Sequence, residues 1–96
     1  MKGVVRIHVE YYGIFRDLAK GVKKETIEVV DRNTIKLREL IDILARKYNS
    51  KIKKYVIEGF GEDIKALILV NGTYADLETT IRDGDVVSIL PPASGG

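Results

Sequence analysis

Two segments near the start of the chain alternate between apolar and polar side chains, the pattern of β-strands with one buried face. In the first, polar side chains separate the apolar residues Val5, Ile7, Val9 and Tyr11. In the second, residues 25–30, the inward-facing side chains are Ile27 and Val29. The two strands are close enough in sequence to pair antiparallel. Between them, residues 12–21 have near-helical apolar spacing, which predicts a short helical turn ending at Gly21.

The period then changes to that of an amphipathic helix. Apolar residues recur at i, i+3, i+4, i+7, i+8 and i+11, and form one stripe: Leu37, Leu40, Ile41, Leu44, Ala45 and Tyr48. The start of this helix is not clear, because Lys36 occupies the position where a capping box has Ser or Thr, although Asn33 or Thr34 would suit a cap chemically. Residues 55–62 show no clear period, and we expect a loop or irregular edge there.

The last third of the chain predicts three more strands. Residues 66–70 form a continuous apolar run, which indicates a strand covered over most of its length. Asn71-Gly72 follows as a type I′ hairpin signal, and residues 73–75 return as a short strand. A tight turn at residues 83–85 precedes the final strand, residues 86–90.

The predicted element order is therefore ββαβββ, an α+β chain. A helical crossover between strands brings a later strand parallel to the first, and we expect the final strand to lie beside the first at the centre of a mixed sheet. One main helix would cross one face of that sheet. This architecture is the β-grasp, or ubiquitin-like, fold. We expect one β-grasp domain over residues 1–90 and a flexible C-terminal tail over residues 91–96.

Composition narrows the possible functions. The net charge of the 96 residues is only +2, which argues against nucleic acid as the main partner. The chain has no cysteine and one histidine, and we predict neither a metal site nor a bound cofactor. His8 falls on the polar side of the first strand, and Asp83 and Asp85 flank a turn glycine, so we interpret them as a solvated residue and as turn formers. No apolar run approaches the ~20 residues that span a membrane, and we expect a cytoplasmic protein without a membrane partner.

The end of the chain offers different chemistry. The final strand runs into Pro91-Pro92, which cannot continue a β-ladder and which favours a stiff polyproline-type exit. Ala93, Ser94, Gly95 and Gly96 follow and add almost no bulk. Six residues let the terminal carboxylate stand up to about 20 Å from the sheet. Such a thin tip suits a narrow channel in another protein. A frayed terminus is the alternative, but the order of strand, Pro-Pro, small residues and Gly-Gly favours a functional tail.

Three stretches carry a family resemblance: Val70-Asn71-Gly72, residues 80–86 and residues 90–96. With these motifs the chain resembles the MoaD family of sulfur carriers, the small subunits of molybdopterin synthase. The similarity extends from the first strand to Gly96. The chain departs from the family at Lys36, where a capping Thr or Ser is common, and over residues 55–62, which are longer than in compact members.

The resemblance implies a protein that is not itself an enzyme. An ATP-dependent activating enzyme of the ubiquitin-activating type would adenylate the Gly96 carboxylate, and a sulfur donor would convert it to a thiocarboxylate. The tail, with Pro91, Pro92, Ser94 and Gly95, would then enter the large subunit of molybdopterin synthase and give sulfur to a precursor of molybdenum or tungsten cofactor. Three alternatives stay open: a ubiquitin-like modifier joined to proteins through Gly96, a sulfur carrier for thiamine or tRNA thiolation, and a plain interaction module.

The docking surface is predicted on the sheet face away from the helix. Along the final strand, Val87 and Ile89 would face the helix and leave Val86 and Leu90 on the other side, with Tyr74 as a further candidate. An apolar patch beside a tail that must be delivered indicates a partner interface. Alternatively, these side chains merely cover the edge of the sheet.

Overall fold

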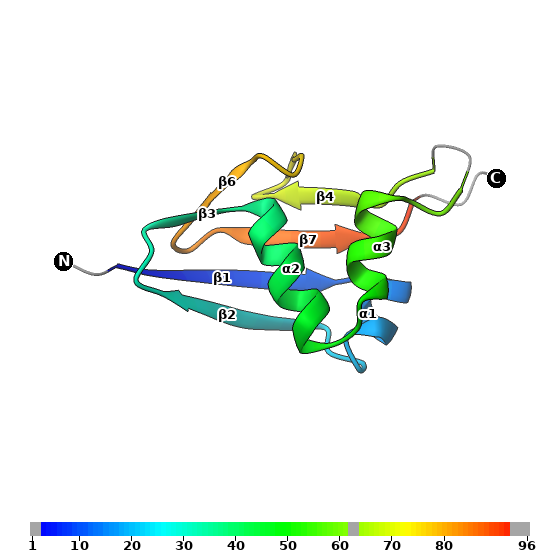
Figure 1. Cartoon of the computed structure of the whole chain (residues 1–96), viewed down its shortest axis with the longest axis horizontal. Coiled ribbons are helices and arrows are strands. Elements are labelled where there is room, and N and C mark those ends of the chain that lie inside the picture. Colours follow the sequence, from blue (N-terminus) through cyan, green and yellow to red (C-terminus); the bar gives the residue numbers. More distant parts are fainter. Residues whose placement is uncertain (1–2, 62–63, 93–96) are drawn as a thin grey trace.

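The computed structural model describes residues 3–61 and 64–92, in which a mixed sheet carries helices on one face (Figure 1). The five-stranded sheet has the order β2-β1-β7-β4-β5. Its strands are β1 (Val4–Tyr11), β2 (Lys24–Val30), β4 (Leu67–Val70), β5 (Thr73–Tyr74) and β7 (Val86–Leu90). Two further strands, β3 (Thr34–Lys36) and β6 (Thr80–Arg82), form a small second sheet. The helices are α1 (Ile14–Leu18), α2 (Leu37–Lys47) and α3 (Lys51–Ile57).

The centre of the sheet has the predicted topology. β1 and β2 pair antiparallel, and β7 runs parallel to β1 with His8 opposite Val86 and Tyr11 opposite Ile89. Asn71 and Gly72 both have positive φ at the β4–β5 hairpin, as a type I′ turn requires. The α+β class and the β-grasp architecture with one main helix, α2, are confirmed.

One hydrophobic core lies between α2 and the sheet. All four predicted inward side chains of β1 are fully buried, as are Val87 and Ile89 of β7. The stripe of α2 meets them with Leu37, Leu40, Ile41 and Leu44. Burial of each such side chain stabilises the fold by about 1.5–3 kcal/mol. The two-residue period in the sequence therefore corresponds to the sheet layer of the structure, and the 3.6-residue period corresponds to the helix layer.

The prediction of a loop over residues 55–62 is wrong at its start, because α3 extends from Lys51 to Ile57. Ile52 is fully buried and holds this helix against the core. The chain then turns so that Phe60 stacks on Tyr55, with ring centroids 4.5 Å apart, and meets Phe15 of α1 edge-on. The segment is therefore a short helix followed by a turn, and the contacts among the three aromatic rings hold that turn in place.

The predicted order ββαβββ is also incomplete, because it lacks α3 and the β3–β6 pair. Thr34, one of the two residues that would suit a helix cap, instead begins β3. Ile35 of β3 lies opposite Ile81 of β6, and both side chains are buried. Each of these strands has three residues and only one buried side chain, which is too little sequence for a recognisable alternation.

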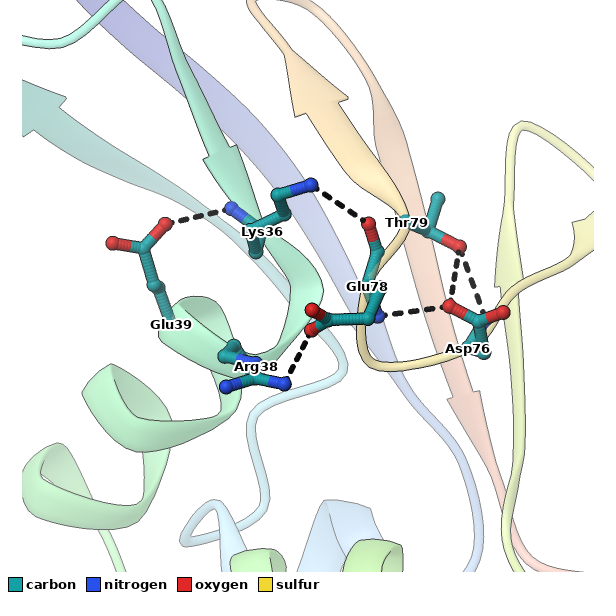
Figure 2. Close-up of polar contacts among 6 residues, drawn as sticks. All are labelled: Lys36, Arg38, Glu39, Asp76, Glu78 and Thr79. Atoms are coloured by element: carbon teal, nitrogen blue, oxygen red, sulfur yellow. Dashed lines mark hydrogen bonds and ion pairs between the residues drawn. The ribbon is translucent and has the colours of Figure 1, made fainter.

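The start of α2 is capped by a distant part of the chain, the loop of residues 76–79, which lies beside the start of the helix (Figure 2). Instead of a Ser or Thr side chain, the backbone carbonyls of Thr79 and Leu77 accept hydrogen bonds from the N–H groups of Leu37 and Arg38, at 2.9 and 3.0 Å. The Glu39 carboxylate accepts the Lys36 backbone N–H at 2.7 Å, which supplies half of a capping box. Neither Asn33 nor Thr34 is therefore the cap. The first free N–H groups of the helix are satisfied by tertiary structure.

The capping loop, residues 76–79, is held in shape by its own side chains. Asp76 accepts the Glu78 N–H at 2.8 Å, and the Thr79 hydroxyl accepts the Asp76 N–H at 3.0 Å. Figure 2 also shows Lys36 and Arg38 reaching Glu78, through its carbonyl and its carboxylate respectively. These contacts hold the loop in the position from which its carbonyls cap the helix.

Glu25 ties the far end of α2 to the sheet. Its carboxylate accepts hydrogen bonds from the hydroxyls of Tyr11 and Tyr48 and from the Lys47 ammonium, all at 2.6 Å. Partial burial would raise the pKa of Glu25, but these three hydrogen bonds outweigh it and hold that pKa below its ordinary value. Burial, with the hydrogen bond to Glu25, raises the pKa of Tyr11 far above its ordinary value. The cluster is therefore stable as one carboxylate with neutral phenols.

We expect Glu25→Gln to lower the free energy of unfolding by about 1–3 kcal/mol at neutral pH, because the hydrogen bonds lose their charged acceptor. The folded-state pKa lies below the ordinary value of 4.5, so this contribution is present above that value and is lost as the pH falls through the folded pKa. The difference between variant and wild type should therefore shrink in acid. Denaturant titrations at pH 7 and pH 3 measure it.

Glu28→Gln is the matched control, since Glu28 lies on the same strand but is exposed, and its one ion pair within residues 3–61 and 64–92 is with Arg6, at 3.5 Å. It should change the free energy of unfolding by less than about 0.5 kcal/mol. An equal loss in both variants, or a Glu25→Gln defect that is the same at both pH values, would contradict the assigned role of the Glu25 carboxylate.

Candidate functional site

The root of the tail lies at the end of β7. The ladder with β4 ends where Leu90 faces Leu67, and the half-buried Pro91 and Pro92 then leave the sheet. The candidate tail residues Ala93, Ser94, Gly95 and Gly96 lie outside the described residues. The site that the structure describes is therefore the tail root and the sheet face beside it.

The open face of the sheet, away from the helices, holds the three predicted interface residues. Val86 and Leu90 are half-buried, whereas their neighbours Val87 and Ile89 are fully buried on the helix side. Tyr74 is 76% exposed. Leu69 lies directly opposite both Tyr74 and Ser88, so Tyr74 shares the face of Ser88 and Leu90.

Two leucines of β4 join this group, and the sequence interpretation did not select them. Leu67 lies opposite Leu90, and Leu69 lies next along the same face. We call Leu67, Leu69, Tyr74 and Leu90 the apolar patch. The run of residues 66–70 was expected to be covered on most of its length, but Leu67 is 36% exposed because helices cover only one face of the sheet. Residues at alternate positions of a strand share one face, and this was the sequence signal that could have identified Leu67 and Leu69.

Polar residues border the apolar patch on the side of β1. Glu10 accepts hydrogen bonds from the Ser88 hydroxyl at 3.0 Å and from the Tyr12 hydroxyl at 3.1 Å. Val86 lies at this polar end, opposite His8, whose Nδ1 is 3.0 Å from the Thr26 hydroxyl. Val86 is therefore separated from Leu90 by Ser88, and Tyr74 lies on the same face two strands away, level with Ser88.

The aspartates around Gly84 are turn formers, as predicted. Asp83 accepts the backbone N–H of Arg6 at 2.7 Å. Asp85 accepts the Arg82 N–H at 2.8 Å and the Asn71 side-chain amide at 3.0 Å. Both carboxylates hold backbone segments in place, and these contacts fix where β7 begins.

Over residues 3–61 and 64–92, no three histidine, aspartate or glutamate side chains are grouped so that they could hold a metal ion. In that part of the chain, no helix is long and apolar enough to cross a membrane.

Comparison with known proteins places the chain in a family. The profile of the ThiS family matches residues 9–96. A relative from Anopheles gambiae, named molybdopterin synthase sulfur carrier subunit, is 35% identical over 95 residues, which cover 96% of this chain and 93% of the relative.

Solved structures agree with that placement. A Pyrococcus furiosus protein with the provisional name molybdopterin converting factor, subunit 1, has a TM-score of 0.72 and 35% identity, and the match covers 93% of this chain and 99% of that one. Small archaeal modifier protein 1 from Methanosarcina acetivorans has a TM-score of 0.69 and 28% identity, over 98% of this chain and 99% of the other.

A third structure is a complex. In the complex of subunits 1 and 2 of the molybdopterin-converting factor from Helicobacter pylori, the matching chain has a TM-score of 0.52 and 31% identity, with coverage of 96% of this chain and 100% of that one. The family profile, the curated relative and the fold agree over almost the whole length. The chain therefore belongs to the ThiS family, the ubiquitin-like group that includes the MoaD-type proteins.

Proposed function

We propose that the protein is a sulfur carrier, activated at the carboxylate of Gly96, that donates sulfur for the synthesis of molybdopterin. The observation that carries this proposal is the 35% identity, over 96% of the chain, to a relative named molybdopterin synthase sulfur carrier subunit. The family match extends to residue 96, so it includes the Gly-Gly end on which the chemistry depends.

The chemistry suits a chain without cysteine. A carboxylate is a poor electrophile until one oxygen becomes part of a good leaving group. Attack of the Gly96 carboxylate on the α-phosphate of ATP releases pyrophosphate and gives an acyl adenylate. A sulfur nucleophile then displaces AMP, and the resulting thiocarboxylate carries sulfur that is nucleophilic without a thiol side chain. ATP is here a substrate of the activating enzyme, and the carrier itself holds no cofactor.

Three partners follow from this proposal. The complex of subunits 1 and 2 in the Helicobacter pylori factor supports the large subunit of molybdopterin synthase as the acceptor of the tail. An ATP-dependent activating enzyme and a sulfur donor would load it. The tail residues Pro91, Pro92, Ser94 and Gly95 would lead Gly96 into each partner, and the apolar patch with Val86 would dock beside the entrance.

We expect some of the protein purified from its own cells to be heavier by the replacement of one oxygen with sulfur. Intact-mass spectrometry followed by fragmentation should locate that change at Gly96. A thiol-reactive alkylator should label the same residue, although the chain has no cysteine. Hydrolysis should remove both signals. Protein from cells that actively make molybdenum cofactor but without any sulfur-bearing form would contradict the proposal.

A protein modifier is the second candidate function, favoured by the 28% identity to small archaeal modifier protein 1. In that case Gly96 would form amide bonds with lysines of target proteins. Antibodies would then detect a ladder of larger conjugates that survive boiling and reductant and that disappear when Gly96 is deleted. Both species together would mean that one activated terminus serves two acceptors.

A further inference from the structure

Pro91, at the root of the tail, lies close to a residue that is far away in sequence. Pro91 lies against Gly13, the residue that joins β1 to α1. A Cβ atom on Gly13 would be 2.7 Å from Cγ, 3.2 Å from Cδ and 3.7 Å from Cβ of Pro91. The first two distances are shorter than the 3.5–4.0 Å, roughly, of favourable carbon–carbon contacts. The absence of a side chain at residue 13 is therefore what leaves space for the proline ring.

The backbone around Gly13 is fixed by hydrogen bonds. The Tyr12 N–H donates to the Ile89 carbonyl at 3.0 Å, which continues the pairing of the β1 end of the chain with β7 close to the tail. The Gly13 carbonyl accepts the Arg16 N–H at 3.0 Å at the start of α1. Phe15, two residues after Gly13, is fully buried. Gly13 thus presents a fixed surface to Pro91.

Gly13 also has φ +56° and ψ −131°, a conformation that residues with a side chain rarely adopt. Gly21, Gly72 and Gly84 also have positive φ, but a Cβ added to any of them would meet nothing within 4 Å. Backbone strain and steric contact can therefore be separated, because Gly21 offers the first without the second.

We propose that Gly13 is a positioning residue, which holds Pro91 so that the tail leaves the sheet in the direction that the activating enzyme requires. This inference rests on the proposed function, because it concerns presentation of the Gly96 carboxylate. Proline fixes its own φ, and the Leu90–Leu67 pair fixes the preceding residue. The Gly13 surface supplies the third constraint on the exit. A displacement at Pro91 would change the direction in which the tail leaves the sheet.

A double-mutant cycle tests the contact. Gly13→Ala should lower kcat for adenylation by about 10-fold or more while KM changes little, because misplacement of a reacting group by about 1 Å can cost about 100-fold. Pro91→Ala removes the two ring atoms that clash and leaves only an ordinary contact at 3.7 Å. In that background, adding Gly13→Ala should change kcat by less than about two-fold. ATP–pyrophosphate exchange with the cognate activating enzyme measures all four proteins, after thermal unfolding has shown each to be folded at the assay temperature.

Gly21→Ala is the control for backbone strain, with φ +83° and open space around its Cβ position. It should leave kcat within about two-fold of wild type. Equal Gly13→Ala defects with and without the Pro91 ring would overturn the inference and leave the proposed function intact. So would an unchanged kcat in Gly13→Ala. A wild-type protein that is not adenylated at all would instead refute the proposed function, and the inference with it.

Discussion

Removal of Gly96, or addition of one residue after it, is expected to abolish adenylation of the chain. The proposed reaction takes place at one carboxylate, which the partner must receive at a fixed depth. One residue changes that depth by about 3.3 Å. This is more than the roughly 1 Å that positioned reactions tolerate without a loss of about 100-fold. The loss should therefore be close to complete in both directions.

The fold should be unaffected by these changes, because every buried core residue of the described structure precedes Pro91. Thermal unfolding should be the same for wild type, the Gly96 deletion and the extended chain. One glycine added before Met1 provides a control of the same size at the other end, and it should be adenylated at the wild-type rate in pyrophosphate exchange. Normal adenylation of a chain extended past Gly96 would rule out the terminal carboxylate as the reactive group.

Leu90→Glu should weaken binding to the large subunit by about 30-fold or more, equivalent to about 2 kcal/mol. Leu90 faces Leu67 on the open side of the sheet and is the member of the apolar patch nearest the tail. A carboxylate placed there would lose its water on docking without gaining a partner. The midpoint of thermal unfolding should change little, because Leu90 is only half-buried.

Val30→Glu is the matched control for that experiment. Val30 is 63% exposed and lies on the same open face as Glu28 and Thr26. It is the last residue of the edge strand β2 and pairs with Val4 at the start of β1, far from the tail. It receives the same charge but should bind the large subunit as wild type does, with titration calorimetry as the measurement. A large loss of stability in Leu90→Glu together with intact binding would mean that Leu90 is part of the core and that the interface lies elsewhere.

Side-chain periodicity predicted the parts of the fold that bury a repeated pattern. The alternation in residues 5–11 predicted β1, and the stripe from Leu37 to Tyr48 predicted α2, because each pattern has several turns or pairs of residues. α3 has the same spacing in Ile52, Tyr55 and Val56, but it is short and three lysines obscure it. The lysines are interleaved with the apolar residues of α3, so the segment looked like a basic run and its helical spacing was not recognised.

Other features depend on contacts that no local pattern contains. Ile35 and Ile81 are single apolar residues in three-residue strands, and only their pairing makes them a sheet. The α2 cap comes from the carbonyls of Leu77 and Thr79, about 40 residues along the chain, and carbonyls are present at every position. The sequence shows that Lys36 lacks the side chain of an ordinary helix cap, but it does not show which groups cap the helix instead.

The candidate site was predicted in a similar, partial way. Leu90 was selected because alternation along the final strand assigns it to a face, and Tyr74 was a further candidate beyond the Asn71-Gly72 turn. The structure puts both on the open face. Leu67 was missed because a continuous apolar run does not reveal which of its sides is covered. Gly13 was missed because its importance comes from Pro91, which is distant in sequence and adjacent in space.

The position of β7 has a consequence for synthesis of the protein. β7 lies between β1 and β4, yet it follows every other element in the sequence. On the ribosome, β1 and β4 must therefore wait with unpaired edges, which favour aggregation, until residues 86–90 emerge. A chain that stops before residue 86 cannot join the two halves of its sheet. The tail continues directly from this strand, so under the proposed function a chain that lacks β7 also lacks the carboxylate that would be activated.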